Sequence, residues 1–380
     1  MEYNILEEVG RGSYGSVYKA KHKTSGKLYA IKRIGVTRCS HYEKNCILNE
    51  MRVLSTHRCP FIVAFKSAYF LDNAVHIVTE FAINGDLHKL FQTSKQAGKR
   101  LDENQIWNFF LQLCVAVDYL HKIKVIHRDL KPANVFLDGN SNIKLGDVGV
   151  AKIMRSYMMY GQTQVGTPLY MSPEVLKRER YDTRTDVWSL GCILYEMMSL
   201  TPAFVCQNMY QLRNHVLSGK VCLTSCGNYT NALASLIPKM ICVNYRHRAD
   251  MKTLMKLVVI KEELAKRNLH DIINNAVEPQ INVHIQMPRC HSDWTHVVKE
   301  FNSPSNTIRL SESNIMRMKN VTEKKSAFPT LFTSLRIRPK RPISEEIKRF
   351  EDLLIEAKKH VENIEAKLIE LRIKELAQRK

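Results

Sequence analysis

The sequence predicts an α+β fold with two lobes, followed by a separate C-terminal helix. Strand-like segments rich in β-branched and aromatic residues fill residues 4–80, whereas helical periodicity dominates from residue 87 onward. The periodicity weakens after about residue 261 and resumes at residue 343. A run of strands followed by a run of helices is typical of segregated β and α layers.

Composition excludes several classes of protein. With 44% hydrophobic and 25% charged residues, the chain is not wholly disordered. Ten cysteines in 380 residues are too few for a disulfide scaffold, so we interpret them as cytosolic thiols. We find neither a signal-peptide pattern nor a run of about 18 apolar residues, and we expect no membrane contact.

The first strands are predicted over residues 5–9, 15–20 and 28–32, and a helix is predicted near residues 42–55. A glycine-rich turn, Gly10-Arg11-Gly12-Ser13-Tyr14-Gly15-Ser16-Val17, joins the first two strands. A dinucleotide-binding turn with these glycines would need a helix directly after Gly15, but strand-like residues follow. A hairpin that covers phosphates with its backbone N–H groups fits better, with an ordinary surface hairpin as the alternative.

A lysine in the third strand strengthens the phosphate interpretation. Lys32, in Ala30-Ile31-Lys32, is placed to reach phosphates, and Glu50 on the predicted helix is the candidate carboxylate to hold it. The alternative is that both are ordinary surface residues. Further on, Asp102 is a predicted N-cap for a helix over residues 103–121.

The most specific motif is His127-Arg128-Asp129-Leu130-Lys131-Pro132-Ala133-Asn134, followed thirteen residues later by Asp147-Val148-Gly149. Phosphoryl transfer needs a carboxylate at the attacking hydroxyl, metal ligands and cations for the developing charge. These two motifs supply all three.

The order of motifs from residue 4 to about 263 resembles a eukaryotic protein kinase domain. The amino-acid sequence of residues 132–137, 144–147, 165–174 and 186–192 resembles that of the NIMA-related (NEK) kinases. The resemblance implies a bilobal kinase fold over residues 4–263, with a small β-rich N-lobe and a larger α-helical C-lobe.

The resemblance also implies roles for individual residues. Asp129 orients the substrate hydroxyl and accepts its proton, and Lys131 neutralises the γ-phosphoryl. Asn134 and Asp147 hold Mg²⁺. The ATP-binding set that the resemblance implies, with Thr79 as gatekeeper and residues 80–82 as hinge, is Gly10, Arg11, Gly12, Ser13, Tyr14, Gly15, Val17, Ala30, Lys32, Glu50, Thr79, Glu80 and Ala82.

Four further residues carry expectations from the resemblance. Glu174 is the expected buried partner of Arg248, and Asp186 is expected to brace the catalytic loop; these are fold-holding roles. Thr163, four residues before Thr167, resembles the family's activating phosphosite, with Ser156 and Thr167 as rivals.

The C-terminal segment predicts a coiled coil over residues 343–380, after a mostly disordered linker over residues 264–342. Apolar residues from Ile347 to Leu371 alternate spacings of three and four, as heptad a and d positions do. We expect self-association through residues 343–371, with the orientation of the helices open. The alternative is one amphipathic helix that docks on the kinase domain.

We therefore expect an active serine/threonine kinase that uses ATP and Mg²⁺ on protein substrates. The alternative is a pseudokinase scaffold that acts through its coiled coil, because Val148 stands where kinases usually have phenylalanine. The family resemblance suggests a cytoplasmic protein with microtubule, centrosome or basal-body partners and a cell-cycle role.

The basic charge does not indicate a nucleic-acid-binding tail. The net charge is 57 − 37 = +20, and residues 1–263 hold 35 basic and 22 acidic residues, or +13. Most of the charge is therefore spread over the expected kinase domain. One compact basic cluster, residues 336–341, is the only feature that supports a nucleic-acid binder, and a nuclear-import signal or a microtubule contact would explain it equally well. A nuclear location is therefore left open.

Overall fold

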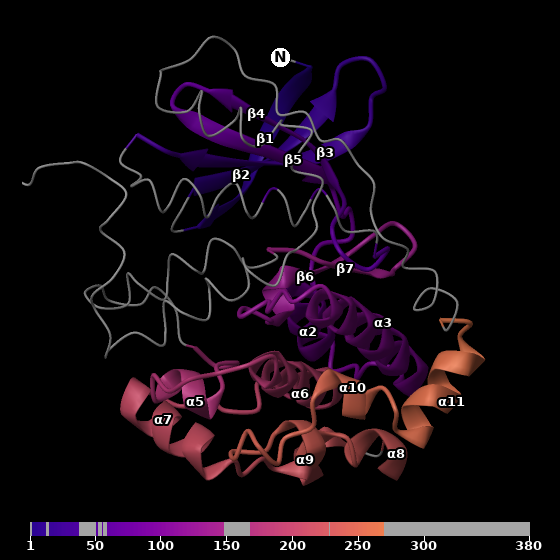
Figure 1. Cartoon of the computed structure of the whole chain (residues 1–380). Coiled ribbons are helices and arrows are strands. Elements are labelled where there is room, and N and C mark those ends of the chain that lie inside the picture. Colours follow the sequence, from indigo (N-terminus) through magenta and orange to yellow (C-terminus); the bar gives the residue numbers. More distant parts are fainter. Residues whose placement is uncertain are drawn as a thin grey trace, which may run out of the picture. The chain divides into compact units, whose positions relative to one another are not determined.

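The computed structural model describes residues 2–12, 15–37, 51, 55, 59–147, 168–227 and 229–269. Its first part is a five-stranded antiparallel sheet in the order β1-β2-β3-β5-β4 (Figure 1). The strands are β1 (Tyr3–Gly12), β2 (Gly15–His22), β3 (Leu28–Gly35), β4 (Phe65–Leu71) and β5 (Ala74–Glu80). The predicted small β-rich lobe is thus confirmed.

The glycine-rich segment is itself part of this sheet. β1 continues beyond the predicted residue 9, because it pairs with β2 as far as the Gly12↔Gly15 partners. Gly15 has a φ of +154°, and a Cβ there would lie 1.7 Å from the backbone oxygen of Arg33. Only glycine therefore permits β2 and β3 to pair at this point.

Strand register places four of the predicted ATP-binding residues on one face of the sheet. Val17 pairs with Lys32, and Ala30 pairs with Thr79. Since Ala30 and Lys32 are two residues apart on β3, all four side chains share a face. On the opposite face, a small buried cluster contains Tyr3, Ala20, Ile31 and Val78.

The second part of the fold is mainly helical, as the sequence predicts, and includes one short two-stranded sheet (Figure 1). Asp102 caps helix α3 through a bond from the Asn104 N–H to its side chain. The elements are α2 (Leu87–Gln96), α3 (Glu103–Lys122), η1 (Pro132–Asn134), β6 (Val135–Leu137), β7 (Ile143–Leu145), α5 (Pro173–Leu176), α6 (Arg184–Ser199), α7 (Met209–Ser218), η2 (Leu223–Cys226), α8 (Asn231–Ala234), α9 (Ile237–Met240), α10 (Met251–Leu254) and α11 (Val258–Lys266).

Helix α6 lies at the centre of the helical core, and residues 185–198 are all buried. Residues 187–198 of this helix are mostly apolar, with Ser189 and Glu196 as exceptions, as expected for a helix that is buried on every side. Gly191 permits close packing, since a Cβ there would lie 2.8 Å from Met240 Cβ on α9. Within the described ranges, no helix is long and apolar enough to cross a membrane.

The last helix of the described part, α11, continues to Lys266, three residues past the predicted end of the kinase domain at residue 263. Leu264 and Leu269 are also buried. Ordered packing therefore extends into the segment predicted as linker, because α11 presents its last apolar side chains to the core. The helix predicted near residues 42–55 lies mostly outside the described residues, and the coiled coil over residues 343–380 lies wholly outside them.

Candidate functional site

The loop that carries Asp129 is held in place by the carboxylate of Asp186 on α6. Asp186 accepts hydrogen bonds from the backbone N–H groups of His127 and Arg128, both at 2.8 Å. His121 Nε2 lies 2.8 Å from the same carboxylate. Arg128 has a φ of 67°, a left-handed conformation that non-glycine residues rarely adopt. The bonds to Asp186 therefore fix a backbone shape that the loop would not favour by itself.

Asp186 performs this task as a charged acceptor. Its side chain is 1% exposed, and burial alone would raise the pKa of Asp186. The hydrogen bonds that it accepts, first among them the bond from His121, outweigh burial and hold that pKa below its ordinary value. Hydrogen bonds to an ionised acceptor are stronger than neutral ones, which suits a brace for the loop.

Two other residues of the motif, Lys131 and Asn134, contact Asp129. Asn134 Nδ2 donates to the backbone oxygen of Asp129 at 2.8 Å and to its Oδ2 at 3.1 Å. Lys131 Nζ also lies 3.1 Å from Asp129 Oδ2. The amide nitrogen of Asn134 thus faces Asp129, which turns the amide oxygen away from that carboxylate. These groups lie close together because all three residues belong to one short loop, which ends in the single turn of η1 from Pro132 to Asn134.

Asp147 joins the cluster through the β6–β7 ribbon. Val135 pairs with Leu145, and the Gly146 N–H donates to Asn134 O at 2.9 Å. Asn134 and Asp147 therefore lie at the same end of the ribbon. A Cβ on Gly146 would lie 2.5 Å from Phe136 Cε2, so glycine is needed directly before the candidate metal ligand.

Lys32 reaches Asp147 from β3. Its Nζ lies 2.8 Å from Asp147 Oδ1, across 115 residues of sequence. This ammonium is the main reason that the pKa of Asp147 lies below its ordinary value. The sequence predicts Glu50 as the partner of Lys32, but Glu50 lies outside the described residues. The contact with Asp147 is one that sequence reasoning missed.

His127 is a further residue whose contacts the sequence did not predict. Its ring is fully buried, and Nε2 lies 2.9 Å from the backbone oxygen of Gly146. Nδ1 accepts from the Asp129 N–H at 3.2 Å. The ring thus connects the backbone beside Asp129 with the backbone beside Asp147, and it sets the spacing of the two carboxylates.

In the glycine-rich hairpin, the predicted residues differ in what their side chains do. The Arg11 side chain is 76% exposed and pairs with Glu8 at 2.8 Å. We therefore assign to Arg11 only a main-chain contribution. Ser13 and Tyr14 lie outside the described residues.

The segment predicted as a hinge has an unexpected side-chain contact. Glu80 Oε1 accepts from the Ala64 N–H at 2.8 Å and lies 3.0 Å from Lys144 Nζ on β7. The Glu80 carboxylate thus joins the strand that precedes the hinge to the helical part of the fold. Its predicted contribution to ATP binding is therefore limited to the main chain. Ala82 follows two residues later, and Thr79 is half-buried on β5.

Glu174 and Arg248 form a buried ion pair, as the resemblance implies. Arg248 NH1 and NH2 lie 2.7 and 2.9 Å from the two carboxylate oxygens of Glu174. Arg248 also donates to the backbone oxygens of Cys242 and Arg184. Burial opposes ionisation of Glu174, yet the hydrogen bonds and charge of Arg248 hold its pKa below the ordinary value.

The donor set fits a hard divalent cation. Within the described part of the chain, no group of three or more His, Cys, Asp or Glu side chains is placed to hold a metal. The candidates are instead the Asp147 carboxylate and the Asn134 amide oxygen. Mg²⁺ prefers oxygen ligands, keeps several waters and binds through one or two carboxylates together with substrate phosphates. Fold and site together define a protein kinase domain.

Comparison with known proteins agrees with this class. The model of the protein kinase domain family matches residues 3–260. Mouse serine/threonine-protein kinase Nek4 is 35% identical over 264 residues, which cover 69% of this chain and 33% of Nek4. The probable serine/threonine-protein kinase nek2 of Dictyostelium discoideum is 35% identical over 274 residues, which cover 71% of this chain and 65% of that protein. Human Nek2 is 32% identical over 289 residues, which cover 73% and 65% respectively.

The chain belongs to the protein kinase family, within its NIMA-related (NEK) group. It spans 33% of the length of Nek4 and 65% of each of the other two relatives. Kinases of this family use ATP and a divalent metal and act on proteins. Thr163 and Val148 lie outside the described residues.

Proposed function

We propose that the chain is an active serine/threonine protein kinase that transfers the γ-phosphoryl group of ATP to hydroxyl groups of protein substrates. The observation that carries this proposal is the cluster in which Lys131 and Asn134 both contact Asp129. Asp147, bound by Lys32, is tied to the same cluster through the Gly146–Asn134 backbone bond.

Each residue has a distinct task in the proposed reaction. Asp129 orients the attacking hydroxyl and accepts its proton, and Lys131 stabilises negative charge on the transferred group. Asn134 and Asp147 hold Mg²⁺, which neutralises charge on the phosphate oxygens when bound. Lys32 contacts the α- and β-phosphates. The names of the relatives and the presence of Lys131 support Ser/Thr rather than Tyr as the acceptor.

The decisive experiment is a kinase assay on a degenerate peptide library with wild type and Asp129→Asn. We expect Asp129→Asn to lower the rate by about 10²- to 10⁴-fold, because the proton acceptor is lost. Asp72→Asn is the matched control, since Asp72 is exposed in a turn with a φ of 48° that asparagine tolerates. If Asp129→Asn and wild type behave alike, the enzyme proposal is wrong and the pseudokinase scaffold replaces it.

We propose self-association through residues 343–371 on the heptad pattern alone. Deletion of residues 343–380 should convert the oligomer to a monomer in light scattering. A deletion variant with unchanged mass per particle would contradict the coiled coil.

We propose Thr163 as the activating phosphosite, because a phosphate there adds charge that Arg128 is suited to bind. Thr163→Ala should stay at the basal rate after incubation with ATP, whereas wild type should gain activity. Equal activation of both would assign the switch to another residue, Ser156 or Thr167 first.

The cellular role is proposed from the family. One relative, the G2-specific protein kinase nim-1 of Neurospora crassa, is 32% identical over 289 residues. We propose a cell-cycle role at microtubules, centrosomes or basal bodies. Fluorescently tagged chain should concentrate at these structures in dividing cells, and an even distribution would contradict the proposal.

A further inference from the structure

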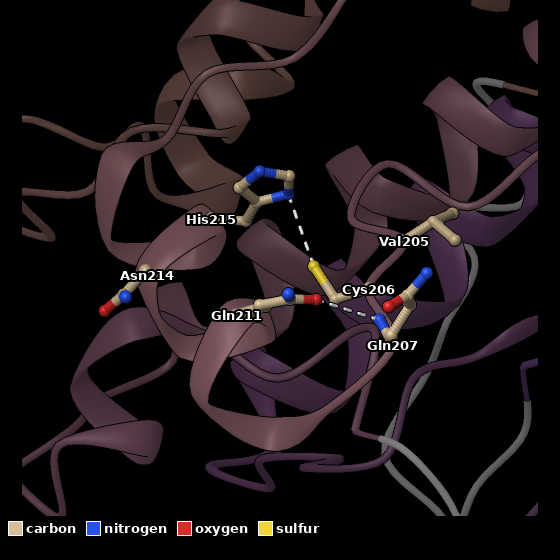
Figure 2. A pocket seen from close by; sticks show the side chains of 6 residues that line it. All are labelled: Val205, Cys206, Gln207, Gln211, Asn214 and His215. Carbon is tan, nitrogen blue, oxygen red and sulfur yellow. Dashed lines mark hydrogen bonds between the residues drawn. The ribbon is translucent and has the colours of Figure 1, made fainter. Parts of the chain in front are cut away.

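The surface around helix α7 combines an open hollow with exposed apolar side chains. The hollow has a volume of about 660 Å³ and is lined by Val205, Cys206, Gln207, Gln211, Asn214 and His215 (Figure 2). Val205, Met209 and Tyr210 are 63%, 47% and 76% exposed. We call residues 205–215 the α7 surface. Single exposed apolar residues are common, but a group of them beside a hollow indicates an interaction site.

The α7 surface is held in place before any partner binds. Asn208 caps α7 by accepting from the Gln211 N–H at 2.9 Å, and Leu212 anchors the helix in the core. Cys206 Sγ and His215 Nδ1 face each other at 3.3 Å (Figure 2). A surface that is already ordered loses little conformational entropy on binding.

The charge around the α7 surface is predominantly positive. Residues 197–249 contain no Asp or Glu, whereas they contain five Lys or Arg residues, of which only Arg248 is buried, in its pair with Glu174. Arg213 is exposed on α7 itself. Helix α5 contacts α7, and three exposed cations, Lys177, Arg178 and Arg180, follow α5 with Glu179 among them. A partner that carries carboxylates would therefore be attracted to this side of the molecule.

We propose that the α7 surface binds an extended acidic segment of a partner protein, with one large apolar side chain beside Val205 and Tyr210. The side-chain amides of Gln207, Gln211 and Asn214 can both donate and accept, as the main chain of an extended peptide requires. None of the six lining residues is Lys or Arg, so the hollow does not suit a chain of phosphates. The surrounding cations select acidic residues on either side of the apolar anchor.

The test uses the full chain carrying Asp129→Asn and measures binding alone. Its outcome therefore does not depend on whether the proposed kinase activity is correct. The probes are peptides selected on this protein from a random dodecapeptide display library. We expect the selected peptides to be rich in Asp and Glu and to contain one large apolar residue. The most enriched peptide is then labelled with fluorescein, and its affinity is measured by fluorescence polarisation.

Matched variants locate the binding. Tyr210→Ser combined with Arg213→Glu should lower the affinity for the peptide by at least about tenfold. Both side chains are exposed, so the variant should melt at the wild-type temperature. The control combines Val258→Ser with Lys252→Glu, two exposed residues of α11 and α10, and should change the affinity by less than about twofold.

Thiol labelling gives an independent readout. Saturating peptide should slow alkylation of Cys206 by iodoacetamide and leave exposed Cys222, which is not part of the hollow, unaffected. The proposal is overturned if no acidic peptide is selected, if the double variant binds as tightly as the control, or if Cys206 is not protected. It is also overturned if a short DNA duplex or phosphatidylserine vesicles displace the peptide at equal charge concentration.

Discussion

Replacing Glu174 with glutamine tests how strongly the helical lobe depends on one buried charge pair. The Glu174 side chain is 3% exposed and that of Arg248 is fully buried. The substitution keeps the size and one acceptor oxygen but removes the negative charge. Arg248 would remain held by the backbone oxygens of Cys242 and Arg184, with its guanidinium 5.0 Å from the centre of the Trp188 ring.

The expected cost is large because Arg248 keeps its charge in a place that water does not reach. Removing one partner of a buried pair costs about 3–5 kcal/mol. The free energy of unfolding of a domain is only about 5–15 kcal/mol, so Glu174→Gln should remove a large share of it. For a domain of this size, that corresponds to a fall in melting temperature of about 6–10 °C.

The assay is urea unfolding of the full chain, followed by tryptophan fluorescence. The matched control is Glu179→Gln, because Glu179 is 55% exposed and lies 4.0 Å from Lys177. We expect the control to change the free energy of unfolding by less than about 0.5 kcal/mol. A Glu174→Gln variant that differs from wild type by no more than this control would refute the reasoning.

The same pair predicts a pH dependence. The pKa of Glu174 is lowered from its ordinary value of 4.5 in the folded protein. A carboxyl with a lowered pKa contributes stability above its unfolded pKa and loses that contribution as the pH falls through the folded value. The difference between wild type and Glu174→Gln should therefore be constant near neutral pH and should shrink below 4.5.

Three further predictions follow from the geometry. Gly15→Ala should weaken ATP binding and lower the melting temperature, whereas Gly35→Ala should do neither, because a Cβ on Gly35 would meet no atom within 4 Å; equal effects in calorimetry would contradict this. Burial raises the pKa of Glu196 to about 7 from 4.5, so the unfolding free energy of wild type should fall by up to about 3 kcal/mol as the pH rises between these values. The fall should be absent in Glu196→Gln, and identical urea curves for the two proteins across this range would exclude it. Hydrogen bonds lower the pKa of Cys222 to about 7, whereas burial raises the pKa of Cys59 to about 11. Alkylation of Cys222 should therefore be the faster at neutral pH and should level off above about pH 8, and a rate that keeps rising through pH 9 would rule this out.

Features that depend on nearby residues could be predicted from the sequence. Asp102 caps α3 as predicted, because an N-cap bond spans only two residues. The three early strands follow from β-branched segments between turn residues. The cluster of Asp129, Lys131 and Asn134 forms within a single loop, so motif spacing already brings these side chains together.

Features that depend on distant residues could not be predicted in the same way. The contacts Lys32–Asp147 and Glu80–Lys144 join strands of the first sheet to β7 and to the residues directly after it, and no periodic pattern connects them. The continuation of α11 to Lys266 has no sequence signal either, because the burial of Leu264 and Leu269 depends on the surface that the core presents to them. The hollow beside α7 has no sequence signal, since its lining residues, Val205 and Cys206 among polar residues, form no recognisable motif.

The bonds from Asp186 to the loop of Asp129 have a consequence for synthesis of the chain. The two backbone N–H groups that Asp186 binds lie 59 and 58 residues before it. A ribosome therefore completes the loop well before it makes the carboxylate that holds Arg128 in its left-handed conformation. Since domains fold as units during synthesis, the loop cannot take its working shape until α6 has left the ribosome. A nascent chain that stops before α6 would hold every residue of the HRDLKPAN motif and yet lack its geometry.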